Sequence, residues 1–268
     1  MFNIDRLDEA AVLTSSSRFF RNMRGQGVPF SALIQAGDDR IKRHNLARYL
    51  AAGCPEVANI EAKSATSYDL ATMILGQDFI TPEEIVAKYP IVYTEDQLKA
   101  LEANFLSIEV IAWCRGNGYM LIPAPPTAMS LLGIRDLNRT LFYSKEGGWY
   151  AEERQTFAQN DKTQVATWLA LRKGVVPNST DKKWKEQLPL LSDVERVPNA
   201  AEFVWGLTTY KEVRGVYLMN AIYARTNSVD SGGDRVIVGI FDAKGLVVSL
   251  WSGDGRYSDI GVASARKF

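Results

Sequence analysis

The chain has 268 residues, 46% of them hydrophobic, so it can bury a large core as one domain with an appendage or as two modest domains. Its 31 basic residues balance its 31 acidic ones, and the overall charge that attracts nucleic acid or an anionic membrane surface is missing. One basic run, residues 40–48 (RIKRHNLAR), is better explained as the solvated face of an amphipathic helix than as a nucleic-acid patch.

The residue types needed for common catalytic and metal sites are scarce. Cys54 and Cys114 are isolated and the single histidine, His44, is remote from both, so neither a zinc site nor a Cys-His nucleophile pair is predicted. Free buried thiols are a better interpretation than a disulfide between the two cysteines. Phosphate-binding motifs of the types G-x-x-x-x-G-K-[ST] and G-x-G-x-x-G are absent, and we expect no cofactor and no metal.

Residues 1–75 are predicted to form a mainly helical N-terminal region. Apolar residues recur at helical spacing over residues 4–13 and 16–23, and again within residues 30–53 before Gly53 and Pro55 end the pattern. The first residues carry acidic side chains and no long apolar core, so no secretory signal is predicted. No stretch approaches the roughly 18 apolar residues of a membrane span.

Two capping boxes mark the next helices. Residues 81–84 (TPEE) and 94–97 (TEDQ) each place Glu or Gln three positions after a capping threonine. The run at 98–118 predicts one long core helix that ends at Gly116 or Gly118, with Cys114 as a small buried side chain.

A short apolar strand follows at residues 119–122, and then the pattern changes to short strands and turns. The run at 141–153 (LFYSKEGGWYAEE) predicts a hairpin, and residues 163–176 predict a buried strand that includes Val165. Residues 197–215 predict a helix opened by Pro198-Asn199 and closed near Gly215, and residues 216–226 predict a strand.

The last two predicted strands, residues 234–241 and 245–251, form a hairpin through the turn DAKG. Alternation along the first strand points Val236 and Val238 to the core and Ile237 outward. A bulge at the glycine that follows would also turn the next residue outward.

An exposed polar loop is predicted at residues 252–259 (SGDGRYSD), between Trp251 in the core and a closing buried strand at 260–265. Such a loop can present side chains on a rigid frame, although an ordinary surface loop is an equal alternative. The carboxylates of Asp242, Asp254 and Asp259 match no calcium-loop spacing.

The C-terminal residues carry a resemblance. The specific elements are the Asp-Arg-Val strand at 234–236, Phe241-Asp242, Gly245-Leu246, Trp251, Arg256 and the ending GVASARKF at 261–268. This run resembles the C-terminus of variable proteins diversified by retroelements, whose fold is similar to C-type lectins and formylglycine-generating enzymes. The resemblance covers the last 50 or so residues and extends less specifically back to Trp149.

The resemblance implies an α+β, C-type-lectin-like domain at residues 76–268, with short antiparallel strands and a variable region at about 225–268. The residues between framework positions would be the diversified, ligand-binding ones: Ile237, Ile240, Val247, Ser249, Leu250, Ser252, Asp254, Gly255, Tyr257, Ser258 and Asp259. Their mixture of aromatic, small polar and aliphatic side chains suits a contact surface. The framework residues would be Val236, Val238, Phe241, Leu246, Trp251, Ile260 and Val262.

The function implied is binding of an unknown protein or cell-surface ligand, with no catalysis and no nucleic-acid partner. Both cysteines precede the region where a formylglycine-generating enzyme needs its reactive pair, and the calcium-dependent sugar motifs Glu-Pro-Asn and Trp-Asn-Asp are absent. An enzyme of unknown type on the same fold, or a structural or assembly protein, are the alternatives. A virion-associated or cytoplasmic location is expected, and monomer and oligomer stay as alternatives.

Overall fold

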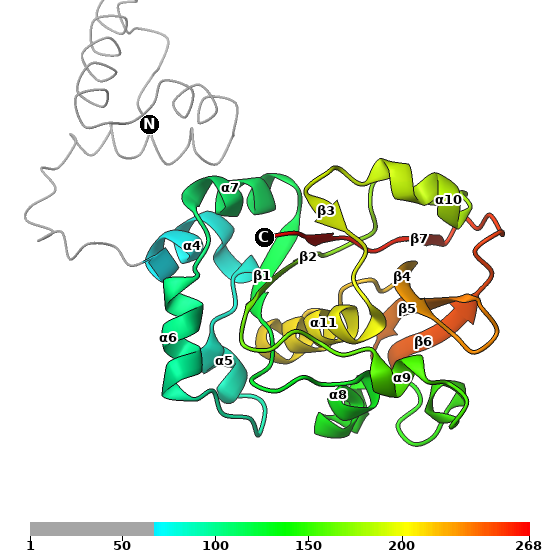
Figure 1. Cartoon of the computed structure of the whole chain (residues 1–268), viewed down its shortest axis with the longest axis horizontal. Helices are drawn as coiled ribbons and strands as arrows, with labels where there is room; N and C mark the ends of the chain where they lie inside the picture. Colours follow the sequence, from blue (N-terminus) through cyan, green and yellow to red (C-terminus); the bar gives the residue numbers. More distant parts are fainter. Residues whose placement is uncertain (1–66) are drawn as a thin grey trace, which may run out of the picture. The chain divides into compact units, whose positions relative to one another are not determined.

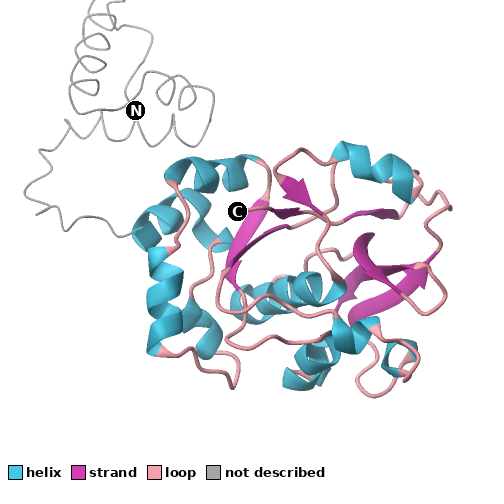
Figure 2. Cartoon of the chain, viewed as in Figure 1, coloured by secondary structure: helices cyan, strands magenta, loops and turns pink. Residues whose placement is uncertain are grey.

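The computed structural model describes residues 67–268, which form an α+β fold of two four-stranded sheets and the helices that cover them (Figure 1, Figure 2). The compact unit that contains them spans Ala65–Phe268. The helices predicted within residues 1–66 lie outside the described residues. No helix in the described part of the chain is both long and apolar enough to cross a bilayer.

The two longer strands of the first sheet are buried on both faces. The sheet has the order β1-β2-β8-β3 with antiparallel pairing throughout. Its strands are β1 (Tyr119–Pro123), β2 (Trp168–Arg172), β8 (Ala265–Arg266) and β3 (Glu195–Arg196). One face of β1 and β2 joins the larger core and the other face joins a second, aromatic-rich core. Burial on both faces explains why residues 119–122 are an uninterrupted apolar run, as predicted.

Helices at the start of the described chain cover the outer face of this sheet. They are α4 (Ser67–Leu75), with the 3-10 turn η2 (Gly76–Asp78) after it, α6 (Glu95–Ala103) and α7 (Ile108–Gly116). The short helix α5 (Pro82–Val86) packs against α11 (Ala200–Arg214) in the larger core instead. Both predicted capping boxes are confirmed. The Thr81 and Thr94 hydroxyls each accept from the backbone N–H three residues on, and the backbone N–H of each threonine donates to the side chain of that later residue.

The prediction of one helix over residues 98–118 is wrong in its middle, because the helix breaks between α6 and α7. In a continuous helix the Leu101 carbonyl would accept from the backbone of Phe105. That carbonyl instead accepts from Trp168 Nε1 at 2.8 Å, and the Phe105 ring turns into contact with Trp168 at 4.9 Å between centroids. The second half ends at Gly116, as predicted, but Ile108 at its start is 51% exposed and not in the core.

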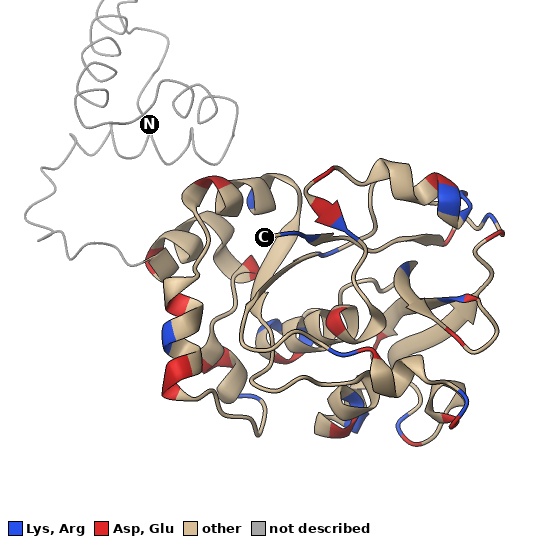
Figure 3. Ribbon diagram, in the orientation of Figure 1, with Lys and Arg blue, Asp and Glu red and all other residues tan. Residues whose placement is uncertain are grey.

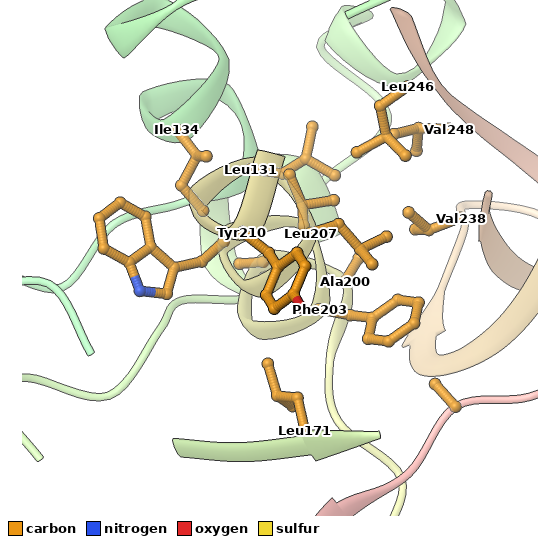
Figure 4. Packing of buried hydrophobic residues seen from close by; sticks show 14 of the residues in the cluster. Leu131, Ile134, Leu171, Ala200, Phe203, Leu207, Tyr210, Val238, Leu246 and Val248 are labelled. Carbon is orange, nitrogen blue, oxygen red and sulfur yellow. The ribbon is translucent and has the colours of Figure 1, made fainter. Parts of the chain in front are cut away.

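Helix α11 (Ala200–Arg214) is the centre of the larger core. Its predicted limits are confirmed by a capping box at Asn199 and a left-handed Gly215 with φ +74°. The helix is buried over most of its length because it lies between the two sheets, with Leu171 of the first sheet on one side and Val238 of the second on the other (Figure 4). Helix α8 (Leu131–Leu137) packs against it.

The hairpin predicted at residues 141–153 is wrong. The segment contains two 3-10 turns, η3 (Arg139–Leu141) and η4 (Trp149–Ala151), and helix α9 (Phe157–Asn160) follows. Its two halves do not pair with each other as strands. They bond to the neighbouring strand instead, since Tyr143 N donates to Leu246 O at 3.0 Å and Trp149 Nε1 donates to Val248 O at 2.9 Å. The strand predicted over residues 163–176 is limited to β2, and Val165 is 46% exposed outside it.

The second sheet has the order β6-β5-β4-β7. Its strands are β4 (Tyr223–Val229), β5 (Arg235–Asp242), β6 (Gly245–Trp251) and β7 (Ile260–Val262). The hairpin of β5 and β6 is confirmed, closed by the pair Asp242 and Gly245. The strand predicted from residue 216 begins only at Tyr223.

The closing strand predicted at 260–265 is two strands in different sheets. Residues of β7 pair in parallel with β4, and β8 then pairs with β2 and β3. Between them Ala263 N donates to Arg225 O at 3.0 Å, and Ser264 O accepts from Arg172 N at 2.9 Å. The C-terminal run therefore joins the two sheets.

Candidate functional site

The candidate site lies on the face of the second sheet opposite α11. Residues paired across the strands share a face, and one such row is Arg225, Ile237 and Ser249. Val238 and Val248, one residue along, face α11 and belong to the core. The predicted alternation along β5 is therefore confirmed.

A crossover loop, residues 252–259, lies over this face. Strand β6 is antiparallel to β5 and β5 is antiparallel to β4, whereas β4 and β7 are parallel. Strands β6 and β7 thus run in the same direction, so the chain must return along the sheet between them. The loop is mostly exposed, as predicted.

Arg225, a fully buried arginine on β4, connects the sheet to the loop. Its guanidinium donates to Ser252 O and Gly255 O in the loop, both at 3.0 Å. It also donates to Lys182 O at 2.9 Å and to Gln187 Oε1 at 3.0 Å. Burial lowers the pKa of Arg225 from its ordinary value, but an arginine stays protonated at neutral pH. A charged donor therefore binds loop and sheet together.

A short helix, α10 (Trp184–Gln187), followed by the 3-10 turn η5 (Leu188–Leu190), borders the loop. Trp184 N donates to Gly253 O and Asp181 N donates to Tyr257 O, both at 2.8 Å. The Arg256 side chain adds a hydrogen bond to Asp181 O at 3.0 Å and an ion pair with Glu186. Charged residues of both signs occur in α10 and in the loop (Figure 3).

The loop is anchored almost entirely through its main chain. The carbonyls of five loop residues accept bonds from the surrounding structure: Ser252, Gly253, Gly255, Tyr257 and Asp259. Arg256, a framework residue by the resemblance, is the residue whose side chain adds hydrogen bonds to this anchoring. Main-chain anchors do not depend on which side chain a residue carries. The exposed side chains of Asp254, Ser258 and Asp259 can therefore change while the loop keeps its course, whereas the Tyr257 ring lies 5.8 Å from the Arg225 guanidinium.

The structure brings most of the predicted contact residues to this surface. Those in the loop are exposed or half-buried, and Val247 and Ser249 are half-buried on the same face. Leu250 pairs with Val236, so its side chain points to the α11 side and is half-buried. Gly255 is restricted, because a Cβ there would lie 2.1 Å from the Tyr257 hydroxyl oxygen.

The prediction that Ile237 is exposed is wrong, since its side chain is only 1% exposed. It lies on the predicted face, but it stands between Arg225 and Ser249 on the face that the crossover loop covers. Ile240 is half-buried and has φ +44°, a left-handed conformation that branched side chains rarely adopt. We expect asparagine or glycine to be tolerated better at this position.

Six of the seven predicted framework residues are buried, and Trp251 is the exception. Its side chain is 45% exposed, so the prediction that it anchors the loop in the core is wrong. Trp251 is the last residue of β6, at the exit into the loop, and its ring meets the Tyr257 ring edge-on at 5.3 Å between centroids.

A second polar cluster is buried beside the first sheet. The Tyr119 hydroxyl lies 2.5 Å from Ser264 Oγ and donates to Glu195, and Ser264 Oγ donates to the same carboxylate at 3.0 Å. These three residues come from β1, β3 and the link between β7 and β8. The three polar groups are hydrogen-bonded to one another, so the cluster links these strands.

Cys114 is buried, as predicted, and burial raises the pKa of its thiol to about 11. Its thiolate forms only as the pH approaches that value, so at pH 8 on the order of 0.1% is ionised against about 25% for an ordinary cysteine. In a Cys54→Ser variant we expect a thiol reagent at pH 8 to label the native protein at least about 100-fold more slowly than the unfolded protein. Equal rates would show that Cys114 is accessible.

Sequence reasoning missed Arg225 and α10. The signal for Arg225 was a charged residue amid the apolar and small residues of a predicted strand, a position where a buried charge needs several partners. Nothing in the sequence placed residues 181–187 beside the C-terminal loop, because the contacts between them span about 70 positions.

Comparison of the chain with protein-family models, with curated proteins and with solved structures found no match.

Proposed function

We propose that the protein is a ligand-binding variable protein diversified by a retroelement, with a C-type-lectin-like domain that displays a changeable surface. The surface comprises the crossover loop and the neighbouring half-buried residues of β6. The resemblance of the C-terminal run to such proteins motivates the proposal.

The observation that carries the proposal is the main-chain anchoring of the loop. A surface meant to vary needs a course that does not depend on its side chains, and the buried Arg225 supports two loop carbonyls irrespective of the residues there. An ordinary surface loop has no need of a buried charge for support. Diversification would then change the chemistry of contact and leave the frame in place.

The genomic test is direct. The flanking DNA should hold a reverse transcriptase gene and a near-copy of the 3′ end of this gene, with adenines concentrated at the codons of the predicted contact residues. A neighbourhood without both elements would refute diversification by a retroelement and leave binding to be argued on other grounds.

Exposed loop side chains should matter little for stability. We expect Asp254→Ala, Ser258→Ala and Asp259→Ala together to change the free energy of unfolding by less than about 1.5 kcal/mol, because exposed substitutions usually stay within about 0.5 kcal/mol each. Chemical denaturation measures this change.

Val238→Ala is the matched control, because Val238 is fully buried on the same sheet. It should lose about 2 kcal/mol. A loss of comparable size in the triple variant would mean that the loop side chains are part of the packing.

A further inference from the structure

The six tryptophans of the chain all lie in the described residues, and five of them have a clear structural partner. Three donate their indole N–H to a backbone carbonyl: Trp149 at 2.9 Å, Trp168 at 2.8 Å and Trp205 at 3.0 Å. The other two are covered by an arginine guanidinium: Trp184 by Arg235 at 4.2 Å from the ring centroid and Trp113 by Arg266 at 5.2 Å.

Trp251 has neither kind of partner. Within residues 67–268 its indole N–H has no hydrogen bond, and its ring contacts the Tyr257 ring edge-on. Trp251 is 45% exposed, so its large apolar ring and its free indole N–H donor both face solvent. A single exposed apolar side chain is common on a protein surface, but an unused N–H beside a second aromatic ring on the proposed binding face is a more specific arrangement.

Trp251 lies where the strand and the loop of that face meet. It ends the strand that carries Val247 and Ser249, and the loop begins at the next residue. Trp184 borders the same place, since a Cβ on Gly253 would lie 3.4 Å from Trp184 Cβ. Clustered aromatic side chains are the residues that most often dominate binding energy at a contact surface.

We infer that Trp251 is the anchor of the binding face, inserting into an apolar pocket of a partner protein and donating its indole N–H to an oxygen at the base of that pocket. The inference rests on the proposed function. The chain itself satisfies three of its tryptophans with backbone carbonyls, an acceptor that a partner protein also offers in abundance. The edge-on rings form a wedge and not the flat aromatic platform on which a sugar stacks.

The loop predicts a second feature of the partner. The exposed carboxylate of Asp254 has no ion pair within residues 67–268. We therefore expect the partner's pocket to be bordered by lysine or arginine, which would speed association at low salt.

The test displays the full chain with residues 252, 254, 258 and 259 randomised and selects against immobilised lysozyme, serum albumin and ubiquitin, with glycan-coated beads in parallel. In each independent protein binder, Trp251→Ser should raise Kd at least about 30-fold. Trp251→Phe, which keeps an aromatic ring but loses the N–H, should raise Kd by about 5-fold. The control Val92→Ser, at a residue 76% exposed between α5 and α6, should change Kd less than about 2-fold.

Each outcome decides a separate point. Failure of every library to yield a binder would overturn the proposed function together with the inference. Binders that lose less than about 3-fold on Trp251→Ser, with an unchanged melting temperature, would overturn the anchor alone. Selection of glycan binders in place of protein binders would overturn the assignment of a protein partner.

Discussion

Replacing Arg225 with methionine should lower the free energy of unfolding by about 3 kcal/mol and release the crossover loop from the sheet. Methionine fills much of the same space but leaves the carbonyls of Lys182, Ser252 and Gly255 and the side chain of Gln187 without their donor. A buried acceptor without a donor costs roughly 1–3 kcal/mol, and part of that cost is recovered where the loosened loop admits water. Chemical denaturation measures the loss, and hydrogen exchange of the amides in residues 252–259 measures the loosening.

Arg256→Met is the matched control for this prediction. The Arg256 side chain is 52% exposed in its ion pair with Glu186, so solvent screens the interaction. The expected loss is below about 1 kcal/mol. Equal losses for the two variants, or unchanged loop exchange in Arg225→Met, would show that the loop holds its course without the buried arginine.

Arg225→Lys should retain little of the stability that is lost in Arg225→Met. A guanidinium presents five donors in a fixed plane, and four bonds from Arg225 diverge to different acceptors. An ammonium group on a flexible stem donates from one atom and cannot reach the same set. A stable lysine variant with a protected loop would mean that positive charge, and not the geometry of the fork, supports the loop.

Local signals in the sequence predicted those elements that local chemistry determines. The threonine capping boxes, the Asn199 cap, the Gly215 stop and the hairpin of β5 and β6 all depend on residues a few positions apart. Alternation likewise identified Val236 and Val238 as core residues.

The failures arose where a distant segment competed for the same groups. The Trp168 indole N–H donates to the Leu101 carbonyl, and this bond interrupts the helix predicted over residues 98–118. The Tyr143 backbone N–H donates to the Leu246 carbonyl, and the predicted hairpin at 141–153 does not form. For the candidate site, sequence reasoning named the loop but not its support, because the partners of Arg225 lie more than 25 positions away on both sides.

Gly239→Ala should be the most damaging single-methyl addition on the second sheet. A Cβ at this position would lie 2.1 Å from Ile222 O and 2.7 Å from Tyr223 Cα, and both are backbone atoms that cannot rotate away. The register of β5 shifts between Gly239 and Asp242, which confirms the bulge that the glycine predicted. The methyl group must push β4 from β5, with an expected loss of about 3 kcal/mol.

Gly253→Ala is the control, because a Cβ there meets the nearest atom at 3.4 Å, an ordinary contact. It should change stability by less than about 1 kcal/mol. At the bulge, Ile240 N and Phe241 N donate to Ile222 O and Met219 O at 3.2 Å each, so the damage should spread to the chain before β4. A Gly239→Ala variant as stable as Gly253→Ala would mean that β4 and β5 can separate at no cost. The second sheet would then not be a rigid support for the loop.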